Sequence, residues 1–208
     1  MDRYLQVWDP AELHFNPESF PWISARSFFG GGGPLSLDLG CGTGEFFCEL
    51  ARRRPDELFI GIDNAYKPLA RAAMSAAAQD LDNLLFLRAD VRQVWVRVPG
   101  SSLRGIYIQF PVPGPAARKY QPRLFDDEFV AEVARALEPH GRLSVLTDRE
   151  AAYNWMLQTA GKIEALRRLG DDEFTIRIDK SLQSHNYAVW IGRGRAPHQL
   201  EFIKSGPG

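Results

Sequence analysis

The chain has 208 residues, 45% of them hydrophobic and 25% charged, which is typical of one globular domain with a sizeable core. No apolar run approaches the roughly 20 residues that cross a bilayer, and the first residues lack the layout of a signal peptide. We therefore expect a cytoplasmic protein with no membrane partner. The net charge of −1 neither requires nor excludes a nucleic-acid partner, because a basic face can be offset by acids elsewhere.

The only cysteines are Cys41 and Cys48. Two cysteines this close together make neither a disulfide framework nor a zinc site, so we expect no bound metal.

Residues 1–34 are rich in aromatic residues and proline, and they end in four consecutive glycines at 30–33 followed by Pro34. We expect an irregular N-terminal segment that packs on the domain and then a flexible hinge here, followed by a single domain over residues 35–208. From Leu35 onward, short apolar runs alternate with segments of helical periodicity. This alternation predicts βαβ units and a parallel sheet.

The stretch from Leu35 to Phe46 is the most informative part of this domain. An apolar run that contains Asp38 is followed by Gly40, Gly42 and Gly44, and then by an amphipathic run. The pattern predicts a strand, a tight turn and a helix. Glycines allow positive φ and close approach of a ligand, and the N-terminus of the helix offers unpaired N–H groups.

The spacing of these glycines separates two ligand classes. Dinucleotide sites favour G-x-G-x-x-G, whereas this chain has D-x-G-x-G-x-G, with Asp38 at the end of the strand. A carboxylate there repels a pyrophosphate but suits the ammonium group of S-adenosylmethionine. The pattern resembles motif I of the class I methyltransferases. A nicotinamide site and an ordinary glycine-rich turn remain open alternatives.

Acidic residues also follow the next two predicted strands. The strand Leu58–Asp63 ends in a carboxylate that can accept both ribose hydroxyls of an adenosine, and we group Asn64 with it in the cofactor site. Asp63 could instead cap the following helix. After the strand Leu84–Arg88, Asp90 can accept the exocyclic amine of adenine while the backbone of Val91 reads a ring nitrogen.

Asp90 could equally cap the helix that begins at Val91. The carboxyl ends of parallel strands meet at one edge of a sheet, where open α/β folds bind ligands. We therefore expect Asp38, Asp63 and Asp90 to lie close together.

The fourth predicted strand, Gly105–Phe110, leads into an unusual segment over residues 110–124. Pro111, Pro113 and Pro115 force an extended backbone and remove three hydrogen-bond donors. A protein core has no need of such a loop. In a methyltransferase, a rigid loop after the fourth strand is where the acceptor is presented.

This segment resembles the signature F-P-D-P-W-P-K-K-R-H-x-K-R-R-L of the bacterial tRNA (guanine-N7-)-methyltransferases. The matching positions are Phe110, Pro111, Pro113, Pro115, Arg118, Arg123 and Leu124. Weaker similarities to the same family involve Asn83, Phe86 and Asp90 in one region, and Thr147, Asp148, Tyr153, Met156 and Leu157 in another.

The resemblance implies a Rossmann-like class I methyltransferase. Its doubly wound, mostly parallel sheet would have an antiparallel strand near the C-terminus, where Phe174–Asp179 and Gln199–Ile203 form a hairpin-like end. It also implies S-adenosylmethionine as cofactor, tRNA as partner, 7-methylguanosine as product, and a monomer or homodimer.

The chain departs from the family at several signature positions. Val112 stands in place of an aspartate, Gly114 in place of a tryptophan and Ala116 in place of a lysine. Near the C-terminus, Ser184 can replace the threonine of T-x-x-E, but Tyr187 cannot replace its glutamate. A second register, with residues 186–192 as the last strand, recovers no glutamate either. Two acids that the family uses around guanine are therefore missing.

The resemblance assigns the remaining substrate contacts. Asp148 is the acid expected near guanine, although it could also cap the helix before Arg149. Arg118, Lys119 and Arg123 would contact phosphates, and Tyr120 or Tyr187 could stack on a base. Two other functions remain open: a methyltransferase of this lineage with a different acceptor, and a cofactor- or RNA-binding module without turnover.

Overall fold

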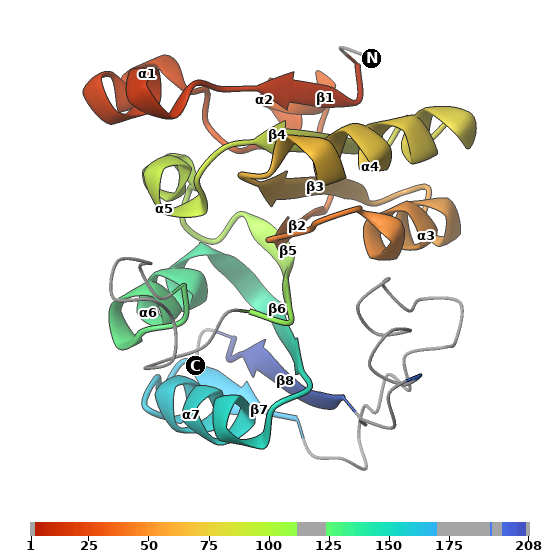
Figure 1. Ribbon diagram of the computed structural model, residues 1–208. Helices are drawn as coiled ribbons and strands as arrows, with labels where there is room; N and C mark the ends of the chain where they lie inside the picture. The colour runs from red at the N-terminus through yellow and green to blue at the C-terminus, as the bar shows by residue number, and fades with distance from the viewer. Residues whose placement is uncertain (1–2, 112–123, 170–191, 193–196, 207–208) are drawn as a thin grey trace.

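The computed structural model describes residues 3–111, 124–169, 192 and 197–206. Within these residues, eight strands form one sheet in the order β1-β4-β3-β2-β5-β6-β8-β7, with helices on both faces (Figure 1). The strands are β1 Leu5–Val7, β2 Leu35–Leu39, β3 Leu58–Asp63, β4 Leu84–Arg88, β5 Leu103–Gln109, β6 Leu137–Thr147, β7 Leu166–Arg168 and β8 His198–Lys204.

The strands from β1 to β6 pair in parallel, and β8 pairs antiparallel with both β6 and β7. The prediction of a doubly wound, mostly parallel sheet with an antiparallel strand near the C-terminus is confirmed. The expected partner strand Phe174–Asp179 and the alternative strand at 186–192 lie outside the described residues, apart from Gly192. In the described part, the neighbour of β8 on its outer side is β7.

Successive strands are added on one side of β2 as far as β4 and then on its other side from β5 onward. The strand order therefore reverses between β2 and β5. In open α/β sheets such a switch point leaves a crevice at the carboxyl ends of the strands. The turn after β2 lies at this crevice and is therefore the candidate site for a ligand.

Two hydrophobic clusters cover the two faces of the sheet. Helices α3 (Glu45–Arg53) and α4 (Tyr66–Ala78) pack on one face, and α5 (Val91–Val94), α6 (Asp127–Ala136) and α7 (Glu150–Gly161) pack on the other (Figure 1). Central strands are buried on both sides, which is why β3 and β4 are almost continuously apolar, whereas β2 buries two polar residues, Ser36 and Asp38.

The expectation that the N-terminal segment over residues 1–34 is irregular is wrong for its described residues, whereas the expected packing on the domain is confirmed. β1 pairs in parallel with β4, and it is followed by α1 (Pro10–Phe15), the 3-10 turn η1 (Pro17–Ser19) and α2 (Ala25–Phe29). Leu13, Phe20 and Ile23 are buried in the main core. Trp8, Phe28 and Phe29 pack against this core as well, whereas Phe15 and Trp22 are exposed. Such contacts are needed because a three-residue strand and short helices are not stable alone.

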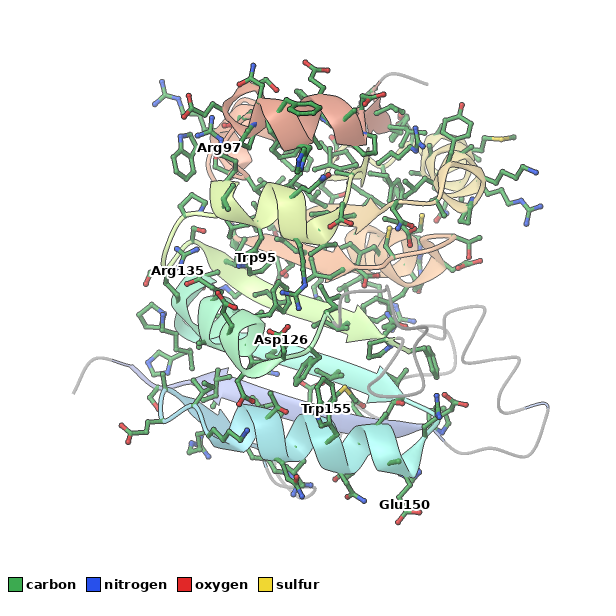
Figure 2. All side chains as sticks on the ribbon, turned by 60° about the vertical axis from the view of Figure 1, so that its left-hand side comes forward. Trp95, Arg97, Asp126, Arg135, Glu150 and Trp155 are labelled. Atoms are coloured by element: carbon green, nitrogen blue, oxygen red, sulfur yellow. The ribbon has the colours of Figure 1, made fainter. Side chains whose placement is uncertain are left out.

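Arg97 fastens this N-terminal segment to the domain. Its Nε donates to the carbonyl of Phe20 at 2.7 Å, a terminal nitrogen donates to the carbonyl of Glu18 at 2.6 Å, and the guanidinium lies 4.8 Å from the ring centre of Trp22. In the turned view it lies beside the N-terminal helices (Figure 2). One planar donor group therefore holds two carbonyls and an aromatic ring of residues 18–22.

Among the described residues, no helix is long and apolar enough to cross a membrane. The same part of the chain contains no group of three or more His, Cys, Asp or Glu side chains that could hold a metal ion.

Candidate functional site

The glycine turn between β2 and α3 divides into two kinds of position. Gly40, Gly42 and Gly44 have φ values of 83°, 56° and 69°, which disfavour any residue with a Cβ. A Cβ on Gly44 would lie 2.6 Å from Phe86 Cζ and 2.7 Å from Ala72 Cβ, so this glycine is required by packing. A Cβ on Gly40 or Gly42 would meet no atom of the described residues within 4 Å, so this part of the chain leaves the space above the turn open.

Asp38 lies below the turn and is 1% exposed. Its Oδ1 atom is buried and has no hydrogen-bond partner among the described residues. Burial raises the pKa of this carboxyl well above its usual value, and the nearby Asp63 carboxylate raises it further. An unpartnered buried carboxylate oxygen is costly unless a donor or a cation reaches it, so Asp38 remains a candidate contact for a cationic ligand.

Asp63 joins the turn to β3. Its Oδ2 accepts from the backbone N–H of Gly42 at 2.9 Å, and its Oδ1 accepts from the N–H of Ala65 at 2.8 Å. The residue before α4 is Ala65, which provides no side-chain cap. Asp63 therefore braces both the turn and the approach to α4. Each carboxylate oxygen keeps a further acceptor site, and the contact with ribose hydroxyls stays a prediction, as does that of the exposed Asn64.

Asp90 caps α5 through its Oδ1, which accepts from the N–H of Arg92 at 2.8 Å. The capping alternative is thus confirmed, and the contact with adenine stays a prediction. Val91 is the first residue of α5, so its N–H has no acceptor within the helix. The N–H of Ala89 donates to the carbonyl of Asp63 at 3.0 Å, which holds the ends of β3 and β4 together.

The structure therefore places the three predicted acids on neighbouring strands. β2 and β4 both pair with β3, and Asp38, Asp63 and Asp90 lie at or just past the carboxyl ends of these strands. The expected grouping of the acids at one edge of the sheet is what the topology gives.

The predicted substrate residues are only partly described. Asp148 follows β6, at the same edge of the sheet as the glycine turn, and is half-buried. The residue before α7 is Arg149, whose N–H donates to Thr147 Oγ1 at 3.2 Å, so the alternative that Asp148 caps this helix is wrong. The predicted contacts Arg118, Lys119, Arg123, Ser184 and Tyr187 lie outside the described residues, as do the departures Val112, Gly114 and Ala116.

Both described ends of the proline-rich segment are firmly anchored. Phe110 has a φ of 51°, and its N–H donates to the carbonyl of Leu146 at 2.6 Å. At the other end, Phe125 is buried with its ring centre 5.7 Å from that of Trp155. The next residue, Asp126, caps α6 and forms an ion pair with Arg92 (Figure 2). The described ends of the segment thus lie beside β6 at one side and at the start of α6 at the other.

The sequence analysis missed a row of polar side chains that runs across the sheet from Asp38. The register pairs Asp38 with Tyr107, Tyr107 with Ser144, and Ser144 with Glu201. Glu201 is 6% exposed, accepts hydrogen bonds from Ser144 and from Gln199 Nε2, and has its pKa raised by burial. The only signal in the sequence is a polar residue at alternate positions of otherwise apolar strands. The row becomes visible once the strand order is known.

A sheet of this order, with a D-x-G-x-G-x-G turn at its switch point and acids after the next two strands, defines a class I methyltransferase. Comparison with known proteins agrees. Residues 32–188 match the family model Methyltransf_4, described as "Putative methyltransferase". The chain also shares its fold with the crystal structure of the 16S rRNA methyltransferase KamB, with a TM-score of 0.58 and 16% identity over 96% of this chain and 95% of that one.

Two curated relatives give the family more closely. The tRNA (guanine-N(7)-)-methyltransferase of Rubrobacter xylanophilus is 36% identical over 97% of this chain and 91% of the relative. That of Chloroflexus aurantiacus is 38% identical over 93% of this chain and 85% of the relative. The chain belongs to the tRNA (guanine-N(7)-)-methyltransferase family.

The methyl donor of this class is S-adenosylmethionine, and the residues of the turn fit it. The orphaned Oδ1 of Asp38 suits a cationic ligand such as an ammonium group. The open space above Gly40 and Gly42 lets a ligand lie against the backbone, where a Cβ would otherwise project. Both features belong to the described residues and agree with the prediction of the cofactor from the sequence.

Proposed function

We propose that this protein methylates N7 of guanine in tRNA, with S-adenosylmethionine as the methyl donor. The observation that carries the proposal is the buried Oδ1 of Asp38, which has no partner among the described residues and lies below a glycine turn that these residues leave open, in a chain of this family. The tRNA substrate comes from the family, and an enzyme that modifies tRNA would act in the cytoplasm, where tRNA is used.

The chain's own residues would hold the donor at the switch point. Asp38 would face its ammonium group, and the backbone of Gly40 and Gly42 would lie along it. Asp63 would add acceptor oxygens for ribose while it keeps the turn in place through Gly42. Asp90 and Val91 would border the adenine at the start of α5.

The acceptor needs no general base, because N7 of guanine carries a free lone pair. S-adenosylmethionine supplies a methyl group on a sulfonium, so that the bond from N7 to the methyl carbon forms as the sulfur–carbon bond breaks and its electron pair stays on sulfur. The protein's task is then to orient the guanine and exclude water. Most of the rate enhancement would come from holding N7 in line with the methyl group.

The methylated purine is a cation, so a carboxylate beside it would stabilise charge that develops in the transition state. Asp148, at the end of β6, is the described acid that we place in this role. Losing one preorganised electrostatic partner costs on the order of 10²–10³ in rate. The reaction can therefore survive Val112 and Tyr187 at the family's acidic positions, because it has no proton to remove.

A second function is favoured by those same substitutions. The family's signature for the guanine acceptor is changed at Val112, Ala116 and Tyr187. The acids predicted to contact the cofactor are all present. A methyltransferase of this lineage with a different acceptor would show this pattern.

Transfer of labelled methyl groups to two tRNA transcripts tests the proposal. One transcript has ordinary guanine, and in the other every guanine is replaced by 7-deazaguanine, which has no nitrogen at position 7. We expect label in the first transcript alone. Equal labelling of both would exclude N7 as the acceptor, and labelling of neither would exclude tRNA methylation.

A further inference from the structure

The exposed face of α4 has an unbalanced positive charge. The helix has the sequence YKPLARAAMSAAA, with two basic residues and no acidic one. Lys67 and Arg71 lie on its exposed face, four residues apart and therefore on neighbouring turns. Neither forms an ion pair or a hydrogen bond with another described residue.

The arginines of the adjacent helix α3 are in a different state. Arg52 and Arg53 both pair with Glu49 at 2.6 Å, and Arg54, just after the helix, lies 3.4 Å from Glu57. Each arginine of this run thus has an acidic partner within the protein, although Arg52 and Arg53 share one carboxylate. The comparison shows that exposed basic residues are not all equally available to a partner.

Two further residues extend the basic face of α4 toward the carboxyl edge of the sheet. Tyr66, the first residue of the helix, is 47% exposed, and the guanidinium of Arg88 lies 6.0 Å from its ring centre. Arg88 ends β4, and its Nε donates to the carbonyl of Asn64 at 3.4 Å, so its charge is not cancelled by an acid. Exposed aromatic and cationic groups that lie together are typical of surfaces that bind RNA.

The basic face of α4 begins beside the predicted cofactor site. The turn from Asp63 to Ala65, which carries predicted cofactor contacts, leads directly into α4. The opposite end of the helix is different, because Asp80 follows it there and pairs weakly with Arg3 at 3.9 Å. Unpaired positive charge is therefore found at the end of α4 that borders the site.

We propose that Tyr66, Lys67, Arg71 and Arg88, here called the α4 surface, bind the phosphate backbone of tRNA next to the cofactor site. Each unpaired cation would neutralise a phosphate, and the Tyr66 ring would contact a sugar or a base. The inference rests on the proposed function, because it supplies a docking surface for that substrate. It differs from the predicted contacts of the proline-rich segment, which come from another part of the chain.

The test compares two double variants with matched changes in charge. Lys67→Gln/Arg71→Gln removes two unpaired cations from α4, and Arg52→Gln/Arg53→Gln removes two paired cations from α3. Affinity for unmodified tRNA is measured by fluorescence anisotropy over a series of salt concentrations. Calorimetry with S-adenosylmethionine and thermal melting check the cofactor site and folding, and glutamine keeps the helix propensity in both variants.

We expect the α4 variant to bind tRNA about tenfold more weakly at low salt, with a slope of log K against log[salt] that is smaller by about 1.5. Its affinity for S-adenosylmethionine and its melting temperature should equal those of the wild type. The α3 variant should keep the wild-type slope. This combination would support the α4 surface as a site of phosphate contacts.

Three outcomes would overturn the proposal. If the wild type methylates tRNA and the α4 variant keeps the full slope, the surface is wrong and the proposed function stands. If both variants lose the same slope, the effect is one of net charge and not of a defined surface. If the wild type neither binds nor methylates tRNA, the proposed function fails, and the surface fails with it.

Discussion

The Asp63 carboxylate accepts a hydrogen bond from the backbone N–H of Gly42 at 2.9 Å. This bond joins the end of β3 to the glycine turn that follows the neighbouring strand β2. Gly42 is in the left-handed region, where its N–H has no helical or sheet partner of its own. The residue expected to hold the ribose therefore also fixes the glycine turn that is predicted to receive the rest of the cofactor. Cofactor affinity and the conformation of the turn should change together when Asp63 is altered.

For Asp63→Ala, we expect both effects at once. Hydrogen bonds to charged groups contribute about 1.5–3 kcal/mol, so affinity for S-adenosylmethionine should fall about ten- to a hundredfold and the melting temperature should also fall. Calorimetry and thermal melting measure the two quantities. The exposed Asp56→Ala is a suitable control. Unchanged affinity in Asp63→Ala would show that the turn forms and binds without this brace.

Asp38→Asn should weaken cofactor binding and yet stabilise the protein without cofactor at neutral pH. Burial raises the pKa of Asp38 above its unfolded value, so the folded state binds more protons than the unfolded state. Its contribution to stability therefore falls as pH rises from about 4, the unfolded pKa, toward the raised folded pKa. Asparagine carries no charge and escapes this loss.

The measurement for Asp38→Asn is the melting temperature of both proteins as a function of pH, without cofactor. The advantage of the variant should be present at neutral pH and shrink toward pH values below about 4. A wild type that is the more stable protein at neutral pH would mean that Asp38 is not an uncompensated buried carboxylate.

The glycines of the turn should separate by what they do. Gly44→Ala places a Cβ 2.6 Å from Phe86 and should destabilise the fold by about 2–4 kcal/mol, from overpacking and from a left-handed backbone. The new Cβ of Gly42→Ala meets no atom of the described residues within 4 Å, so its cost should be limited to about 1–2 kcal/mol of backbone strain.

In the same pair of variants, Gly42→Ala should show the larger relative loss of affinity for S-adenosylmethionine, because its Cβ projects into the open space above the turn. Chemical denaturation and calorimetry give both quantities. The reverse order of destabilisation would contradict the packing described for Gly44.

Arg97→Ala should release the N-terminal segment from the domain. The change leaves the carbonyls of Phe20 and Glu18 without their donor, at a cost of about 1–3 kcal/mol. Limited proteolysis followed by mass spectrometry should find faster cleavage near residues 18–22. Arg104→Ala, which breaks the surface pair with Glu138, is the control and should be cut like the wild type. Equal protection in all three proteins would mean that the buried residues of the segment hold it without Arg97.

The strands whose carboxyl ends carry the predicted cofactor contacts could be predicted from the sequence, because apolar runs and glycine spacing are local signals. The apolar runs Leu58–Asp63 and Leu84–Arg88 have the bounds of β3 and β4, and the D-x-G-x-G-x-G spacing located the turn. β1 could not be found in this way. Its three residues become a strand only through their register with β4, which depends on the completed sheet.

The polar row that includes Ser144 and Glu201 could not be predicted from the sequence for the same reason, because it depends on strand order. Ser144 and Glu201 are 57 residues apart, and they meet because β8 returns antiparallel beside β6. Sequence analysis also left the role of Asp90 open between a helix cap and a ligand contact, and the structure confirms the cap while the ligand contact stays a prediction. Local pattern locates strands and turns, whereas side-chain partners depend on strand order.

The central claim is tested most directly by identification of the nucleoside that the enzyme makes. Unmodified tRNA is incubated with the protein and S-adenosylmethionine, digested to nucleosides and analysed by liquid chromatography and mass spectrometry. The account predicts that 7-methylguanosine appears with the wild type and is strongly reduced with Asp38→Asn. A different methylated nucleoside, or none although the protein binds the cofactor, would contradict it.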